Sequence, residues 1–437
     1  MEQALQAIAY LEEIYWSYIG WALICGTGLY LTIKSRGFQF KVLSNFRANF
    51  HELLKEGRRG DRHGIHPFKL YFASIGGMVG IGNIVGVGAG VMIGGPGSIF
   101  WMWVACFCGM LMKYAEIYLG IKYRVSCGNG SYNGGPMYYL QEAFEGSLGK
   151  FLAYLFAFLL CLYGIEVFQF TTLVERIEHT FHFDRSWIIG VLVIMCIYTV
   201  MGGIRRLSSI CTVMMPIFMV GYIAICFYII GVNIDTVSSV IVEIFTGAFT
   251  GHAQVGGFVG STMIMAAYQG TSRAVYAGDI GVGYDSCLQS ETMIVDPKKQ
   301  AQISIYALFT DTFICMMTTM LLAVTGAWSS MNDLSSSEVI STILSGYLPY
   351  ADLFMTILLF FAGFTTVTAF FAVGVKNAVF ISPKYGKWTY IAIGVCGFIY
   401  FPRFPAEDVI HIMLFISGCL VLINVFGILK LIKKIEF

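Results

Sequence analysis

The sequence predicts an all-α polytopic membrane protein that forms a single transmembrane domain over residues 1–437. Hydrophobic residues make up 57% of the chain and charged residues only 12%, whereas a soluble domain is about 45–50% apolar and about 25% charged. Apolar segments of membrane-spanning length recur along the chain, and Lys and Arg concentrate in every second connection between them. These three observations exclude a soluble protein, because most of the surface must face lipid.

Eleven segments are candidate spanning helices, since such a helix needs about 20 mostly apolar residues. We expect the first of them to be an extra helix that precedes two repeats of five helices, over residues 74–232 and 255–430. The candidates are 16–33, 74–93, 98–121, 151–175, 187–202, 209–232, 255–275, 301–327, 350–373, 388–401 and 408–429.

The placement of cations supports this count and sets an orientation. With the N-terminus outside, segment 34–70 is cytoplasmic and carries nine Lys and Arg residues, whereas the outer loops 233–254 and 328–349 carry none. This is the positive-inside asymmetry of membrane proteins, so the sequence predicts a cytoplasmic C-terminus. Segment 34–70 is basic and partly amphipathic, and is expected along the inner membrane surface. Inner loops also hold Lys122, Arg124, Arg205, Arg206, Arg273, Lys298, Lys299, Lys376, Lys384 and Lys387.

Cysteine and histidine usage argues against metal, redox or enzymatic chemistry. The twelve cysteines lie mostly inside apolar runs and form no CxxC pair, so they are expected to pack as small hydrophobic residues. Most of the seven histidines lie in loops, and no His/Glu or Ser/Lys constellation stands within the spans. We therefore expect no enzyme, no cofactor and no nucleic-acid partner, and a protein that works as a monomer in the lipid bilayer.

The glycine-rich segment 76–83, GGMVGIGN, is expected to break the first core helix. Its glycines fall on several faces within a few residues, so the helix has little side-chain packing and a high entropic cost. Unwound backbone at membrane depth is tolerated only where it is buried or lines a cavity. Transporters use such breaks to receive an anionic group on free amides and a cation on free carbonyls. Residues 80–83 therefore suit a small carboxylate. The later glycines, which are expected to allow close helix packing, are Gly86, Gly90 and Gly94.

An inverted repeat requires a second interrupted segment in the matching position of the other half. The segment 255–275 meets this requirement, because glycines interrupt it and polar side chains lie at or near membrane depth. The interrupting glycines are Gly256, Gly257, Gly260 and Gly270, and the polar candidates are Tyr268, Gln269 and Ser272.

Further polar residues within the spans are functional candidates, because intramembrane polar groups are costly. Gln169 on the third core helix could hold the ammonium or the carboxylate of a substrate, or make a helix–helix hydrogen bond. Glu166 lies one turn earlier, and Asp311 is expected to make a structural hydrogen bond. Lys113 and Glu116, three residues apart, are expected to pair with each other.

The segment 361–371, FAGFTTVTAFF, places Ala362, Thr365 and Thr366 on one helix face. One carbonyl and two hydroxyls from this face, with two carbonyls from an unwound helix opposite, give five oxygens. Such a neutral oxygen set suits a small hard cation. The alternative is that both threonines bond back to their own helix.

Several motifs resemble the alanine/glycine:cation symporter family. The stretch GGPGSIFWMWVACFCG, residues 94–109, is similar to that family's GGPGAVFWMW signature, and VGIGNIVGV resembles its VGTGNIAGV. The loop 123–140 ends in GGPMYY, as in the family, and DIGVG, DPKKQA and FTDT are similar to its EAGLG, HPVRQG and FIDT segments. The resemblance extends from residue 16 to residue 430.

The resemblance implies a leucine-transporter-type inverted repeat of five plus five helices with one extra helix in front. It implies sodium-driven uptake of alanine or glycine, in some members D-alanine, across the bacterial inner membrane. The substrate carboxylate would meet the amides of Ile81 and Gly82 near Gly80 and Asn83, with Gln169 matching a family glutamine. The implied sodium ligands are Gly76, Val79, Ala362, Thr365 and Thr366.

The chain departs from the family pattern at several of these positions. Met78 stands where the family has Arg, Ile81 where it has Thr, and Asp279 where it has Glu. Phe370 replaces a Trp, and we expect it to line the substrate site with room for a slightly larger neutral amino acid. Two alternatives remain: a proton-coupled carrier of the same fold that uses Glu166 or Asp311, and a channel.

Overall fold

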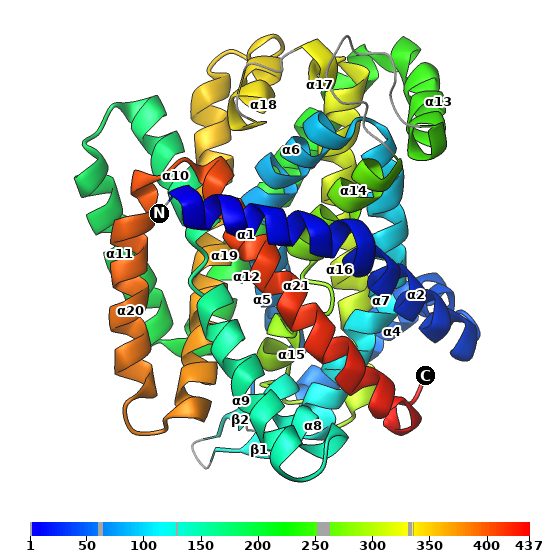
Figure 1. Cartoon of the computed structure of the whole chain (residues 1–437), viewed down its shortest axis with the longest axis vertical. Helices are drawn as coiled ribbons and strands as arrows, with labels where there is room; N and C mark the ends of the chain where they lie inside the picture. Colours follow the sequence, from blue (N-terminus) through cyan, green and yellow to red (C-terminus); the bar gives the residue numbers. More distant parts are fainter. Residues whose placement is uncertain (1, 60–63, 128–129, 251–262, 331–333, 335) are drawn as a thin grey trace.

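The computed structural model describes residues 2–59, 64–127, 130–250, 263–330, 334 and 336–437, and nearly all of this chain is helical (Figure 1). The prediction of an all-α polytopic membrane protein is confirmed. The one sheet among the described residues is a two-stranded antiparallel ribbon, β1 (Val125–Ser126) and β2 (Tyr132–Asn133), in which Val125 pairs with Asn133 and Ser126 with Tyr132.

Within the described part of the chain, six helical segments are long and apolar enough to cross a membrane. They are α7 (Gly97–Lys122), α9 with α10 (Gly146–Tyr163 and Val167–Phe181), α12 (Gly203–Val232), α16 (Pro297–Val324), α19 (Ala351–Ile381) and α21 (Ala406–Lys430). A seventh span consists of α5 (Pro67–Met78), the 3-10 turn η2 (Ile81–Asn83) and α6 (Val85–Gly94), bent by 56°.

Four predicted spans correspond to shorter helices, so the count of eleven and the five-plus-five repeat stay predictions. These helices are α2 (Trp21–Lys34), α11 (Arg185–Met201), α14 (Met263–Gly278) and α20 (Gly386–Tyr400).

The remaining elements lie at the ends of the spans and at the N-terminus. Figure 1 shows α1 (Glu2–Tyr15) crossing over α14 and α21, an arrangement that the sequence did not reveal. A π-helical turn, η1 (Trp16–Gly20), joins α1 to α2. The other elements are α3 (Phe38–Ser44), α4 (Phe46–Arg59), α8 (Pro136–Ala143), α13 (Ile234–Thr250), α15 (Tyr284–Gln289), α17 (Ala327–Ser330), α18 (Ser336–Ser345), η3 (Phe401–Arg403) and η4 (Ile432–Lys434).

Local sequence explains where the central helices begin. Pro67 and Pro297 occupy the first turns of α5 and α16, where a missing N–H costs nothing. The Asp296 side chain caps α16 by accepting a hydrogen bond from the Lys298 amide at 2.9 Å. These starts fix the register of the two helices that hold the first break.

A second interrupted helix lies at residues 279–283, between α14 and α15, a break that the sequence did not predict. Asp279, Gly281 and Gly283 have positive φ values of 50°, 72° and 87°, which a continuing helix cannot contain. Gly270 does not interrupt a helix but lies inside α14. Its missing side chain lets α14 approach the α7 backbone closely, since an added Cβ would be 2.3 Å from the Ser98 carbonyl oxygen. Gly256, Gly257 and Gly260 lie outside the described residues.

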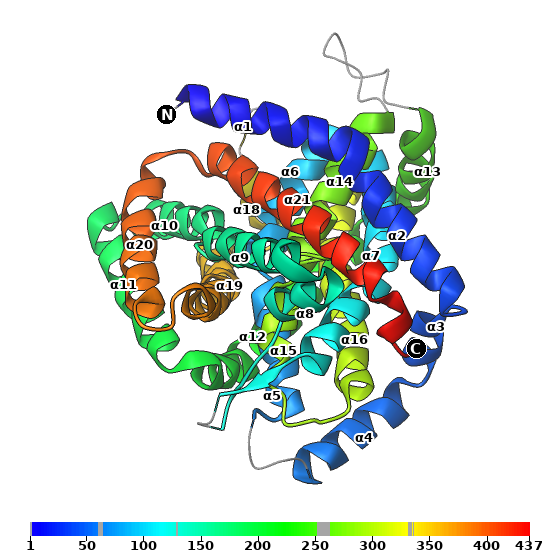
Figure 2. The same ribbon diagram turned by 60° about the horizontal axis from the view of Figure 1, so that its bottom comes forward.

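A third interruption divides the predicted span 151–175. Residues 164–166 separate α9 from α10, and Glu166 is the residue that precedes α10. Gly164 is required here, because an added Cβ would lie 2.6 Å from Tyr390 Oη and 2.9 Å from the Phe370 carbonyl oxygen. Figure 2 shows α9 and α10 following one another beside α19.

Candidate functional site

In the first break, residues 79–84, backbone amides that a continuous helix would satisfy donate hydrogen bonds to side-chain oxygens instead. Gly80 is extended, with φ −128° and ψ −162°. Its amide donates to Asn83 Oδ1 at 2.9 Å, and the Ile81 amide donates to Gln169 Oε1 at 2.9 Å. Because all of these groups are buried, the amides require such acceptors. The predicted neighbours Gly80, Ile81, Gly82, Asn83 and Gln169 are therefore brought together.

Asn83 anchors the break to α16. Its Nδ2 donates to Asp311 Oδ1 at 2.6 Å, and its carbonyl oxygen accepts from Thr318 Oγ1 at 2.9 Å. Tyr222 of α12 is 2.7 Å from the same Thr318 hydroxyl. The structural hydrogen-bond role expected for Asp311 agrees with this contact, although its Oδ2 has no partner.

Only glycine fits at residue 80. A Cβ there would lie 2.3 Å from Gln169 Oε1 and 2.5 Å from Thr366 Oγ1. The close approach lets α10 and α19 reach bare backbone from two sides. A small carboxylate that replaced Gln169 as the acceptor would meet the same amides.

The α19 face predicted to bind sodium lies directly against the end of α5. Thr366 Oγ1 donates to the Gly76 carbonyl oxygen at 3.0 Å, and Thr365 Oγ1 lies 2.9 Å from the Ala362 carbonyl oxygen. Val79 is the residue that ends α5. Four of the five predicted oxygens are thus joined in two hydrogen-bonded pairs. Thr365 also bonds back to Phe361 at 2.8 Å, as the alternative interpretation requires.

The predicted aromatic wall residue Phe370 lies one turn beyond Thr366. Its ring stacks on Tyr284 with centroids 4.1 Å apart and meets the edge of Tyr163 at 5.2 Å. Tyr284 lies beneath Gly77, whose added Cβ would be 2.2 Å from the Tyr284 hydroxyl oxygen. Phe370 therefore packs on the α15 side chain that lies against the last turn of α5.

Two predicted substrate residues lie elsewhere on α14. Tyr268 donates its hydroxyl to Glu12 Oε2 at 2.8 Å. Gln269 packs against Gly94, at the end of α6 away from η2, where an added Cβ would be 2.9 Å from Gln269 Cβ. The structure does not bring either residue to residues 80–83.

Sequence reasoning missed Tyr276, which belongs to the site. A Cβ added at Gly82 would lie 3.0 Å from Tyr276 Cε1. The Tyr276 hydroxyl donates to Glu166 Oε1, and its ring meets Phe168 at 6.0 Å. Glu166 is fully buried and its Oε2 has no partner. A tyrosine in an apolar helix carries no distinguishing signal, so only the packing could identify it.

The second break is held by buried charges. Lys113 Nζ lies 3.6 Å from Asp279 Oδ2 and 3.7 Å from Asp285 Oδ2, and it donates to the Gly278 and Asp279 carbonyl oxygens. The expected pairing of Lys113 with Glu116 is wrong. Glu116 Oε2 instead accepts from Asn424 Nδ2 at 3.0 Å. Lys113 pairs with Asp279 and Asp285 in preference to the acid three residues along its own helix. Among the described residues, no cluster of acids, cysteines and histidines has the arrangement of a metal site.

Comparisons with known proteins place the chain among transporters. The model of the sodium:alanine symporter family matches residues 1–436. The chain is 32% identical to an uncharacterized transporter of Haemophilus influenzae, over 87% of this chain and 83% of that one. It is 30% identical to the sodium/alanine symporter AgcS of Methanococcus maripaludis, over 81% and 78% of the two chains. A solved Na+-coupled sialic acid symporter shares the fold, with TM-score 0.53 and 12% identity over 93% of this chain and 80% of that one.

Proposed function

The chain belongs to the sodium:alanine symporter family, and from this premise we propose that it takes up a small neutral amino acid together with sodium by alternating access. It is a sodium-coupled amino-acid symporter and a multi-pass membrane protein, not an enzyme. The proposed substrates are alanine, glycine or a slightly larger neutral amino acid. The sodium ion is a co-transported ligand, and no other cofactor is required.

The observation that supports the substrate site is the pair of buried amides at Gly80 and Ile81, each satisfied by a side-chain oxygen. A carboxylate can replace those acceptors with charge-assisted hydrogen bonds, which are stronger than neutral ones. Gln169 then turns from the Ile81 amide to the substrate. Tyr276 and Phe370 limit the space beside the substrate's side chain.

The proposed sodium site uses the carbonyls of Gly76, Val79 and Ala362 with the hydroxyls of Thr365 and Thr366. Sodium binding replaces the Thr366–Gly76 hydrogen bond with two ion contacts. The same ion then ties α19 to the broken helix. This couples the ion to the amides on which the substrate binds. The membrane potential contributes about 2.3 kcal/mol per charge per 100 mV.

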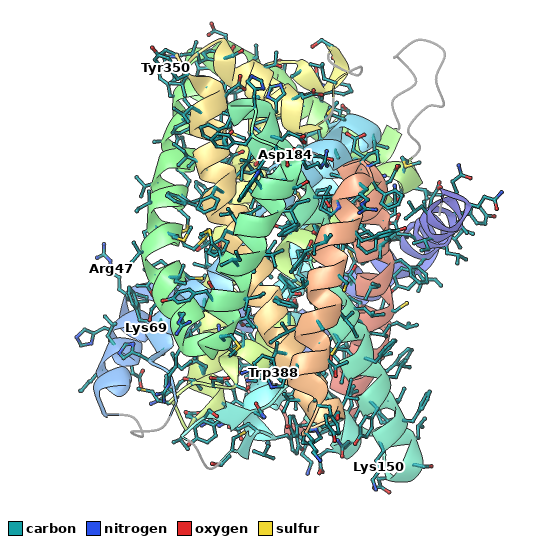
Figure 3. The ribbon with its side chains drawn as sticks, turned by 90° about the vertical axis from the view of Figure 1, so that its left-hand side faces the viewer. Arg47, Lys69, Lys150, Asp184, Tyr350 and Trp388 are labelled. Carbon is teal, nitrogen blue, oxygen red and sulfur yellow. The ribbon has the colours of Figure 1, made fainter. Side chains whose placement is uncertain are left out.

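The proposed orientation places the N-terminus outside and the C-terminus in the cytoplasm of a bacterial cell, with the protein in the inner membrane. Figure 3 shows Lys69 and Lys150 in the lower half of the molecule and Tyr350 and Asp184 in the upper half, with Arg47 at about mid-height. Two of the three labelled cations thus lie toward one end. The positive-inside pattern assigns that end to the cytoplasm.

The experiment that tests the function is uptake of labelled alanine, glycine and serine into proteoliposomes, with and without an inward sodium gradient. The test variant is the double substitution Thr365→Ala with Thr366→Ala. The matched control is Thr368→Ala, because Thr368 is buried on the same helix and bonds back to Phe364 at 2.7 Å.

We expect sodium-driven uptake in the wild type and the Thr368→Ala control, and its loss in the double variant. Sodium-independent uptake driven by a pH gradient would refute the sodium site. It would favour a proton-coupled carrier, for which the unpartnered oxygens of Glu166 and Asp311 are the candidate proton sites.

A further inference from the structure

Arg273 is a buried cation that has no partner in the described part of the chain. Its side chain is 3% exposed, and its Nε and Nη1 atoms are enclosed without a hydrogen-bond acceptor. Sequence analysis assigned Arg273 to an inner loop, and this is wrong: it lies within α14, because that helix continues to Gly278. A guanidinium stays charged at every physiological pH, so it cannot avoid the cost of burial by losing a proton.

The other buried cations show how this protein normally satisfies such a charge. Lys113 has two carboxylates within 3.7 Å. Arg176 is 5% exposed and pairs with Asp352 at 2.8 Å. Lys376 pairs with Glu291 at 2.9 Å. Arg273 makes no such pair with a described residue. An unpaired buried charge costs several kcal/mol, so a bound anion would stabilise the charge that the described residues leave unpaired.

The position of Arg273 connects it to the substrate break. Gln269, Arg273 and Tyr276 share one face of α14 at helical spacing. They lie over the glycines of the first broken span: Gln269 against Gly94, Arg273 against Gly90 and Tyr276 against Gly82, with added Cβ atoms 2.9, 2.7 and 3.0 Å from the respective side chains. Figures 1 and 2 both show α6 beside α14.

This face, the α14 ladder, runs from the end of α6 at Gly94 to η2. Its lowest member, Tyr276, touches Gly82 of the proposed substrate site. Its other two members carry an unsatisfied acceptor and unsatisfied donors: Gln269 Oε1, like Arg273 Nε and Nη1, is buried without a partner among the described residues. The ladder therefore offers a donor fork and an acceptor one turn apart, which match the two ends of a zwitterion.

We propose that Arg273 is a carboxylate-binding station, where the amino-acid substrate is held between the α6 end of the transporter and the broken segment. The guanidinium binds the carboxylate through two parallel N–H donors, and Gln269 Oε1 accepts from the ammonium group. The substrate carboxylate then passes to the amides of residues 80–82. This inference rests on the proposed function, because it assumes an amino-acid substrate.

The test compares Arg273→Gln and Arg273→Lys with Arg176→Gln, a control in which another nearly buried arginine is removed. Two quantities are measured: the KM and kcat of sodium-driven alanine uptake, and the shift in the thermal unfolding midpoint of the purified protein caused by propionate. Sodium chloride at equal concentration serves as the reference for the second measurement.

We expect Arg273→Gln to raise the KM for alanine about tenfold or more, equivalent to about 1.4 kcal/mol, while the sodium concentration for half-maximal uptake stays unchanged. Arg273→Lys should recover part of the loss, because it keeps the charge but not the planar fork. Propionate should stabilise the wild type and Arg176→Gln more than Arg273→Gln, because that variant keeps only the amides of residues 80–82 as a carboxylate site.

Wild-type KM in Arg273→Gln would overturn the station, and so would a propionate shift of wild-type size in that variant. A chloride shift as large as the propionate shift would overturn the carboxylate assignment. The two measurements separate failure of this inference from failure of the proposed function. Absence of amino-acid uptake in the wild type would contradict the proposed function, whereas the propionate shift tests Arg273 without requiring transport.

Discussion

The breaks between α5 and α6 and between α14 and α15 both interrupt a helix, but neutral groups stabilise the first and charged groups the second. At residues 79–84 the freed amides are held by neutral or amide oxygens, Gln169 Oε1 and Asn83 Oδ1. At residues 279–283 the backbone is fixed by Lys113 between two buried aspartates and by glycines of positive φ. The first set of bonds can be exchanged for a ligand. The second set cannot be exchanged without leaving a buried charge unpaired.

This difference indicates which break moves. A hydrogen bond between neutral groups contributes about 0.5–1.5 kcal/mol net, so a substrate carboxylate can replace Gln169 at low cost. Removing one member of a buried ion pair costs about 3–5 kcal/mol. The first break is therefore the adaptable element on which the proposed substrate site rests, and the second is the more rigid of the two.

The largest effect is expected at the rigid break. Lys113→Met leaves Asp279 and Asp285 buried without their cation and should destabilise the protein by about 3–5 kcal/mol. Thermal unfolding of the purified protein measures this loss. Lys122→Met on the same helix is the control, because Lys122 is exposed and its ammonium group donates to the Lys434 carbonyl oxygen at 2.8 Å.

Equal stability of Lys113→Met and Lys122→Met would contradict the greater rigidity of the second break. The triple variant that adds Asp279→Asn and Asp285→Asn to Lys113→Met should recover part of the stability. It removes the uncompensated charges as well as the pair.

A smaller effect on stability but a strong effect on transport is expected at the adaptable break. Gly80→Ala places a Cβ 2.3 Å from Gln169 Oε1 and 2.5 Å from Thr366 Oγ1, so both side chains must move. Uptake should fall at least about tenfold, equivalent to about 1.4 kcal/mol. The measurement is initial-rate uptake in proteoliposomes.

Gly86→Ala is the matched control for this substitution on the same broken span. Its Cβ would meet no atom closer than Ile410 Cδ1 at 3.7 Å, so its uptake should stay near wild type. If Gly86→Ala lost as much transport as Gly80→Ala, the effect would belong to helix packing and not to the break.

The smallest effect is expected from backbone conformation alone. Gly281 has φ 72°, and a Cβ there would meet only the flexible end of Met112 at 3.2 Å. Gly281→Ala should therefore cost about 1–2 kcal/mol of stability. Denaturation curves that show no loss would indicate that the second break adapts as readily as the first. Gly231→Ala, in open space within α12, should be neutral or stabilising.

The sequence by itself determined the features that depend on composition and local pattern. The apolar content alone predicts a membrane protein. The glycines of GGMVGIGN weaken the first core helix whatever its packing partners are. The threonines of FAGFTTVTAFF share a face through helical periodicity alone. Local sequence motifs such as GGPGSIFWMW also identify the family without any knowledge of tertiary contacts.

Only the tertiary structure decided which polar groups meet. The break between α14 and α15 was not predicted, because the contacts of Asp279 and Asp285 with Lys113 join residues far apart in the chain. Tyr276 joins the site through a long-range contact with Glu166, and Arg273 has no acceptor for Nε or Nη1 among the described residues. Periodicity reports which residues share a face, but the partner of that face is set by packing between segments far apart in the chain.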